Sequence, residues 1–232
     1  MQGTVVSVVI PAYNEEKMIG NIIEETMQVM ENLGLPYEII VVDDGSVDRT
    51  REVASKYKAI VVSNEQNRGK GYALRKGFKY AHGDIIVTID ADGSHNPKEI
   101  PDLLNPLFNG ADVVAGSRFL GRAKDHTSKL HQFGNSLINA TIMVITGKMV
   151  TDSQTGFRAF KKDFLRQISL ESYGYDIETE IILKSLKNGF KLKEVPISCK
   201  KREHGISKLK TLPDGFKIFK TILKSATRNN HH

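Results

Sequence analysis

The sequence predicts an α/β fold with a mostly parallel central sheet flanked by helices. In its first half, short runs of apolar and β-branched residues alternate with segments whose apolar residues recur at helical spacing. Strand–helix alternation of this kind joins parallel strands by right-handed crossovers. Apolar residues make up 40% of the 232-residue chain, so a sizeable core can form. These observations argue against a disordered chain.

The first half of the chain is expected to supply most of the sheet. The expected strands are residues 4–10, 38–42, 59–63, 85–89 and 111–116. The expected helices are residues 15–33, 47–58, 69–81 and 97–108. Gly34 is a natural C-cap for the first helix, and Pro97 is favourable in the first turn of the last one.

After Gly116 the pattern becomes less regular. A polar loop over residues 117–129 is followed by a helix at 130–146, a strand at 156–160 that returns to the sheet, a helix at 178–187, a strand at 191–197 and a basic loop at 200–210. Pro196 cannot donate a ladder hydrogen bond, so the last strand is expected near an edge of the sheet. Apolar residues recur at helical spacing between 212 and 223, beside three lysines.

Charge and cysteine content limit the class of protein. The net charge is +6, and most of the surplus lies between Lys184 and the C-terminus, which suggests an anionic partner: nucleic acid, a phosphorylated substrate or an anionic membrane. The single cysteine, Cys199, excludes an internal disulfide framework and fits a reducing compartment. We find no secretory signal and no apolar run of roughly 18 residues, the length that a membrane span needs.

Two carboxylates follow the most apolar strand. Asp90 and Asp92 stand directly after residues 85–89, at the end of a strand that reads as buried on both faces. Open α/β sheets bind ligands at the carboxyl ends of their strands, and carboxylate oxygens suit Mg²⁺ or Mn²⁺. An ordinary acidic turn would also explain this short pattern.

Three other strands end in polar motifs, which a parallel sheet brings to the same edge. They are Pro11-Ala12-Tyr13-Asn14-Glu15, Asp43-Asp44-Gly45-Ser46-Val47-Asp48 and Gly116-Ser117-Arg118. The set suits a nucleotide, with an aromatic ring to face a base, a carboxylate to accept from base N–H groups and a metal to bridge a diphosphate. Residues 67–71 are basic and glycine-rich, and they suit either phosphate binding or a solvated helix start. Dinucleotide-binding and P-loop glycine motifs are absent.

These ordered motifs resemble those of the family 2 glycosyltransferases, which have the GT-A fold. Residues 152–158, Asp-Ser-Gln-Thr-Gly-Phe-Arg, and 207–209, Ser-Lys-Leu, narrow the resemblance to polyprenyl-phosphate glycosyltransferases of the dolichyl-phosphate mannose synthase and glucosyltransferase type. The resemblance covers nearly the whole chain. It implies a GT-A catalytic domain over residues 1–210, with a nucleotide-sugar half at 4–116 and an acceptor half at 117–210, and a basic amphipathic C-terminal helix at 211–230.

The resemblance also implies roles for individual residues. Nucleotide binding falls to Pro11, Ala12, Tyr13, Glu15, Val42, Asp44, Arg68, Asp90 and Ala91; metal binding to Asp90, Asp92 and Ser94; catalysis to Asp92 and Arg118; and phosphate or acceptor binding to Arg118, Arg202, Ser207 and Lys208. Ser94 departs from the pattern, because mannose synthases commonly carry Gln there as a further metal ligand.

The implied reaction is the inverting transfer of a hexose from a UDP- or GDP-linked sugar to a polyprenyl (dolichyl) phosphate, with Mg²⁺ or Mn²⁺. A lipid monophosphate is already anionic near neutral pH, so it needs no general base. The leaving diphosphate must be stabilised by the metal and nearby cations. Ser94 and the 152–157 pattern slightly favour a UDP-linked donor.

The helix at 130–146 and the basic C-terminal helix resemble the family's interfacial helices. They imply peripheral contact with an anionic membrane, on its cytoplasmic face, although both could simply pack on the sheet. A hydroxyl acceptor on a glycan or polysaccharide is the alternative, and it would require a base such as Glu178 or Glu180. A basic nucleic-acid-binding module is a remote third hypothesis, since few aromatic residues accompany the basic runs; we expect no nucleic-acid partner.

Overall fold

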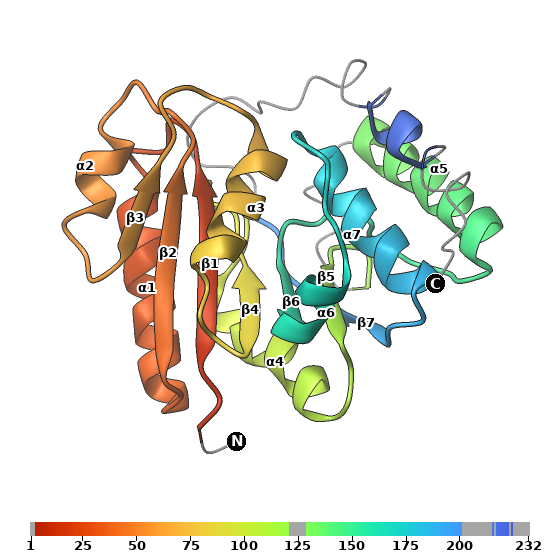
Figure 1. The fold of residues 1–232 in the computed structure, drawn as a ribbon, viewed down its shortest axis with the longest axis horizontal. Coiled ribbons are helices and arrows are strands. Elements are labelled where there is room, and N and C mark those ends of the chain that lie inside the picture. Colours follow the sequence, from red (N-terminus) through yellow and green to blue (C-terminus); the bar gives the residue numbers. More distant parts are fainter. Residues whose placement is uncertain (1–2, 121–128, 201–214, 216, 223, 225–232) are drawn as a thin grey trace.

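The computed structural model describes residues 3–120, 129–200, 215, 217–222 and 224. Its centre is a seven-stranded sheet with the order β3-β2-β1-β4-β6-β5-β7 (Figure 1). The strands are β1 (Val6–Ala12), β2 (Tyr37–Asp43), β3 (Ile60–Ser63), β4 (Ile85–Thr88), β5 (Val113–Ser117), β6 (Arg158–Lys161) and β7 (Leu192–Pro196). The helices are α1 (Ile19–Leu33), α2 (Thr50–Ala54), α3 (Lys70–Tyr80), η1 (Pro97–Glu99), α4 (Ile100–Phe108), α5 (Lys129–Thr146), α6 (Lys162–Gln167) and α7 (Asp176–Lys187).

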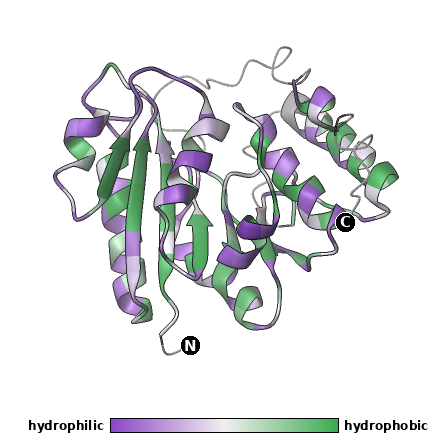
Figure 2. Ribbon diagram, in the orientation of Figure 1, coloured by the Kyte–Doolittle hydropathy of each residue, from purple (hydrophilic) through white to green (hydrophobic). Residues whose placement is uncertain are grey.

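Helices cover both faces of the sheet, as predicted. On one face, Val8 and Ile10 of β1 pack with Ile23 of α1 and with residues of α4. On the other face, Val9 of β1 packs with Leu74 of α3 and with residues of α6 and α7. Alternate residues of one strand therefore enter two different cores. Figure 2 shows β4 hydrophobic along its length, whereas α1 and α3 alternate between hydrophobic and hydrophilic residues.

The sheet is mostly parallel, with one exception. β1 pairs in parallel with β2 and β4, β2 with β3, and β5 with β7. β6 runs antiparallel to both of its neighbours, β4 and β5. The predicted return of residues 156–160 to the sheet is confirmed, and this strand separates β4 from β5. β7 lies at the edge of the sheet, as Pro196 indicated.

The expected first and second helices begin later than their periodicity suggested. Residues 14–16 donate their backbone N–H groups to side chains of the 46–50 segment: Asn14 N to Ser46 Oγ at 2.9 Å, Glu15 N to Thr50 Oγ1 at 2.7 Å and Glu16 N to Asp48 Oδ2 at 3.1 Å. The two loops thus satisfy each other's polar groups instead of forming helical turns. α6 was not predicted, because six residues carry too little periodicity.

The described residues at the C-terminal end have helical backbone, and they pack on the second half of the chain. Ile218 and Ile222 are buried in one cluster with Ile142 of α5 and with Ile182 and Leu183 of α7. Among the described residues, no helix is both long enough and apolar enough to cross a bilayer.

Candidate active site

The carboxyl ends of β1, β2 and β4 open into a pocket of about 520 Å³. Its lining residues are Pro11, Ala12, Tyr13, Glu15, Asp44, Asn67, Gly69, Lys70, Ala73, Asp90, Ala91, Asp92 and Tyr175. Eight residues in this set were assigned to the nucleotide or the metal from the sequence. Val42 instead lies in the hydrophobic core beneath the pocket, and Arg68, Ser94 and Arg118 are not part of its lining.

Asp44 binds the backbone of the segment that leads into α3. Its carboxylate accepts hydrogen bonds from Asn64 Nδ2 at 2.7 Å, from Arg68 N at 3.0 Å and from Gly69 N at 2.7 Å. Burial raises the pKa of Asp44, and these donated hydrogen bonds partly oppose the rise. Two N–H groups of the glycine-rich segment therefore bind this carboxylate, although the sequence suggested that they could face a phosphate. The Arg68 guanidinium lies 4.1 Å from the centre of the Tyr72 ring.

Asp90 forms the most strongly charged contact of the pocket. Its Oδ1 lies 2.6 Å from Lys70 Nζ, and its Oδ2 lies 3.7 Å from Nε2 of the buried His95. Burial alone would raise the pKa of Asp90, but the ammonium of Lys70 and the His95 ring hold it well below its usual range. Asp90 is therefore an ionised carboxylate that already has a cationic partner in the protein.

Asp92 stands in the turn that follows. Its Oδ1 accepts from the backbone N of Ser94 at 2.9 Å, and Gly93 between them has a φ of 75°. This left-handed conformation suits glycine, and a Cβ at Gly93 would lie 2.5 Å from Met18 Cε. The carbonyl of Ser94 accepts from Lys200 N at 2.9 Å, which ties the turn to the segment after β7.

Glu178 of α7 extends the charge pairing away from the pocket. Its Oε1 lies 2.9 Å from Lys70 Nζ, and its Oε2 lies 3.3 Å from the Nη1 of Arg158. Arg158 is fully buried, and its guanidinium also donates to the carbonyls of Glu178 at 2.7 Å and Ser153 at 2.9 Å. Asp90, Lys70, Glu178 and Arg158 thus form one chain of alternating charges.

Neither Lys70 nor Arg158 is assigned a role by the sequence motifs. Lys70 was noticed only as part of a basic, glycine-rich segment, and Arg158 only as the last residue of the 152–158 motif. Arg158 did carry a signal, because it stands in an apolar strand between Phe157 and Ala159, both fully buried. A charged residue in such a strand is expected to have a buried partner.

Arg118, at the end of β5, is held by a bidentate ion pair. Its Nε donates to Asp152 Oδ2 at 2.7 Å, and its Nη2 donates to Asp152 Oδ1 at 2.9 Å. Burial disfavours the charged guanidinium, but the Asp152 carboxylate raises the pKa of Arg118 overall. The 152–158 motif therefore fixes Arg118 at the strand-end edge of the sheet. Arg202, Ser207 and Lys208, the other phosphate-binding candidates, lie outside the described residues.

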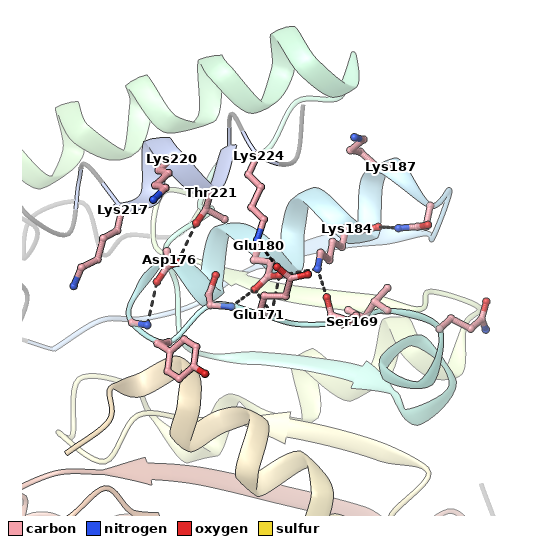
Figure 3. Close-up of a pocket in the computed structure, with 16 residues that line it drawn as sticks. Ser169, Glu171, Asp176, Glu180, Lys184, Lys187, Lys217, Lys220, Thr221 and Lys224 are labelled. Atoms are coloured by element: carbon pink, nitrogen blue, oxygen red, sulfur yellow. Dashed lines mark hydrogen bonds and ion pairs between the residues drawn. The ribbon is translucent and has the colours of Figure 1, made fainter. Parts of the chain in front are cut away.

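Glu180, one of the two candidate bases, faces a different pocket. This pocket, of about 530 Å³, lies between α7, the segment before it and the described C-terminal residues (Figure 3). The Glu180 carboxylate accepts from Glu171 N at 2.9 Å and Ser172 N at 2.8 Å, and it pairs with Lys184 at 2.7 Å. Glu180 therefore holds the 171–172 backbone in place. Glu178, the other candidate, is paired with Lys70 and Arg158 and is not part of the lining of the pocket at the ends of β1, β2 and β4.

The donor atoms of the pocket fit a hard divalent cation. Asp90 and Asp92 bring carboxylate oxygens to one strand end, which are the ligands that Mg²⁺ and Mn²⁺ prefer. Within the part of the chain that the structure describes, no group of three or more His, Cys, Asp or Glu side chains is placed to hold a metal ion.

A family model for glycosyl transferase family 2 matches residues 7–169, from the second residue of β1 through β6. The chain belongs to glycosyl transferase family 2. As a member of this family it is a glycosyltransferase with the GT-A fold, as the motifs predicted.

Two relatives of this chain are named as transferases that use dolichyl phosphate. One is a UDP-N-acetylglucosamine–dolichyl-phosphate N-acetylglucosaminyltransferase of Methanococcus voltae, 33% identical over 96% of this chain and 96% of the relative. Another is a dolichol-phosphate mannosyltransferase of Pyrococcus furiosus, 36% identical over 88% of this chain and 59% of the relative. Among solved structures, glucosyl-3-phosphoglycerate synthase from Mycobacterium tuberculosis, in complex with Mn²⁺, UDP and phosphoglyceric acid, has a TM-score of 0.78 and 26% identity, covering 98% of this chain and 80% of that one.

Proposed function

We propose that this glycosyltransferase moves a hexose from a nucleotide sugar to a polyprenyl phosphate such as dolichyl phosphate, with inversion at the anomeric carbon. The observation that carries the proposal is the strand-end pocket, which gathers Tyr13, Asp44, Asp90 and Asp92 around one space. The names of the Methanococcus and Pyrococcus relatives support a dolichyl-phosphate acceptor.

Within this pocket the chain's residues divide into two groups. Pro11, Tyr13 and Asp44 form the wall proposed for the nucleoside, with Tyr13 facing the base. Asp90 and Asp92 would hold a Mg²⁺ or Mn²⁺ ion, with Ser94 in the same turn as a further oxygen donor. When bound, such an ion stabilises the negative charge that develops on the leaving diphosphate.

The pairing of the two candidate bases supports a phosphate acceptor over a hydroxyl. A sugar hydroxyl must lose a proton to attack, whereas a phosphate monoester is already anionic near neutral pH. Glu178 is paired with Lys70 and Arg158, and Glu180 binds the backbone of a different pocket. Neither carboxylate is placed to accept a proton in the strand-end pocket. We assign Arg118 to phosphate binding at the same edge, together with Arg202, Ser207 and Lys208.

We propose that the donor is a UDP-linked sugar. The Methanococcus relative is named for a UDP-linked sugar, and the solved Mycobacterium enzyme was crystallised with UDP and Mn²⁺. Ser94, in place of the Gln that is common in mannose synthases, favours the same choice.

The acceptor would approach from a membrane surface on the side of α5. Phe133, Leu137, Met143 and Val144 are exposed, and their spacing puts them on one side of α5. Phe219, in the described C-terminal residues, is also exposed, and Lys217, Lys220 and Lys224 belong to the same helical segment. Apolar side chains flanked by lysines suit the headgroup region of an anionic bilayer. We therefore propose peripheral binding at the cytoplasmic face.

The direct test is transfer of radiolabelled sugar to dolichyl phosphate. UDP- and GDP-linked hexoses are incubated singly with the protein, the lipid phosphate and Mg²⁺ or Mn²⁺, and chloroform-soluble product is counted. We expect a metal-dependent lipid-linked product with a UDP-linked donor, and none after addition of EDTA. Transfer to a glycan hydroxyl, with no lipid-linked product from any donor, would overturn the proposal.

A further inference from the structure

Lys70 holds a position in the active site that its place at the start of α3 does not explain. Its ammonium lies 2.6 Å from Asp90 and 2.9 Å from Glu178, and its side chain is only 12% exposed. A lysine at a helix N-terminus is unfavourable with respect to the helix dipole, so this placement is not a local preference of α3. The two carboxylates are what hold the ammonium there.

The Gly156 backbone packs closely against one side of this pair. A Cβ added to Gly156 would lie 2.4 Å from Asp90 Oδ2 and 2.5 Å from Lys70 Nζ. The His95 ring, stacked on Phe157 at a centroid distance of 5.4 Å, lies 3.7 Å from Asp90 Oδ2. Lys70, His95 and the Gly156 backbone thus surround the Asp90 carboxylate on the sides away from the pocket, into which 23% of its side chain is still exposed. A divalent cation that ligates Asp90 must compete with the ammonium for it.

The charges nearby set the strength of that competition. Asp90, Asp92 and Glu178 bring three negative charges, and Lys70 and Arg158 bring two positive ones. Arg158 also pairs with Glu178 and neutralises part of its charge. The Lys70 ammonium therefore compensates Asp90 as well as Glu178. Within a partly buried site, a unit charge a few ångströms from a divalent cation changes binding by about tenfold or more.

We propose that Lys70 is a built-in counter-ion of Asp90, and that it sets how tightly the nucleotide-free protein binds a divalent cation. Lys70 is a positioning residue, because it acts on the metal through Asp90. The inference rests on the proposed function in taking Asp90 and Asp92 as the metal-binding pair. It goes beyond that function by giving the protein its own cation at the site, which lowers metal affinity until a substrate brings additional negative charge.

The test measures Mn²⁺ binding without nucleotide or lipid, from the loss of the electron paramagnetic resonance signal of free Mn²⁺. We expect Lys70→Met to bind Mn²⁺ about tenfold tighter than the unmodified protein. The control is Lys79→Met, which removes the same charge from an exposed position of the same helix and is expected to leave Mn²⁺ affinity unchanged. Because sugar transfer is not measured, failure of the proposed acceptor would not affect this result.

Two further variants test whether Lys70 acts through Asp90. In an Asp90→Asn background, Lys70→Met should raise Mn²⁺ affinity much less than it does in the unmodified protein, because the carboxylate that the substitution would free is absent. Glu178→Gln keeps Lys70 but leaves Asp90 as its remaining carboxylate, so Mn²⁺ binding should weaken by about threefold or more. This variant also serves if Lys70→Met does not fold. Unchanged Mn²⁺ affinity in folded Lys70→Met or in Glu178→Gln would refute the role of Lys70, and so would an equal gain with Asn at position 90.

Discussion

Replacing Arg158 with methionine is expected to destabilise the fold strongly. Arg158 is fully buried, and its guanidinium pairs with Glu178 and donates to the carbonyls of Glu178 and Ser153. Methionine would fill much of the volume but would remove the hydrogen bonds to the two carbonyl oxygens and leave part of the Glu178 charge uncompensated. Removing one member of a buried ion pair costs 3–5 kcal/mol, and Lys70 still compensates Glu178, so we expect a loss of about 3 kcal/mol.

Urea denaturation followed by circular dichroism measures this loss. The matched control is Arg166→Met, which breaks an exposed ion pair with Asp163 and should cost about 0–1 kcal/mol. The double variant Arg158→Met with Glu178→Gln should cost less than the sum of the single variants, since each single variant leaves a buried partner uncompensated. A loss below 1 kcal/mol for Arg158→Met, or strict additivity, would refute the view that these two residues stabilise the site as a pair.

Three other outcomes are expected. Asp92→Asn should reduce transfer by at least about a hundredfold, as measured by lipid-linked product, because the metal loses a charged ligand; an unchanged urea midpoint would separate this from unfolding. Burial opposes the shift, but a backbone N–H from residue 191 and the Lys161 ammonium lower the pKa of Asp112. Its stabilising contribution is therefore present above about pH 4 and lost at lower pH, so the stability difference between the unmodified protein and Asp112→Asn should shrink between about pH 5 and pH 2. Val144→Glu should weaken flotation with anionic vesicles, whereas Val47→Glu, at an equally exposed position, should not.

The order of elements and the edge that carries the site could be predicted from the sequence. Apolar runs that end in Pro11, Asp43 and Asp90 identified the strand ends, and parallel pairing then required those ends to meet. The pocket lining confirms that the motifs at these three ends share one space. What made this possible is that strand periodicity and turn chemistry are local properties.

The contacts within the site could not be predicted, because they join segments distant in sequence. Lys70, Glu178 and Arg158 meet only after three separate elements have packed together. The same is true of Asp44, whose partners are 20 to 25 residues further along the chain. A carboxylate in a strand-end motif can bind a metal, a base or the protein's own backbone, and only the folded structure distinguishes these uses.

The antiparallel β6 has a consequence for synthesis of the chain. β3, β2, β1 and β4 can assemble once residue 88 has left the ribosome, but β5 has no place beside β4 until residues 158–161 arrive between them. For some 70 residues of elongation, the growing sheet keeps an unpaired edge at β4, the kind of edge that invites pairing with another chain. The strand that later closes this edge begins with Arg158, and Gly156 lies in the segment just before it. The catalytic edge of the sheet is therefore completed in the same step that protects the nascent protein from aggregation.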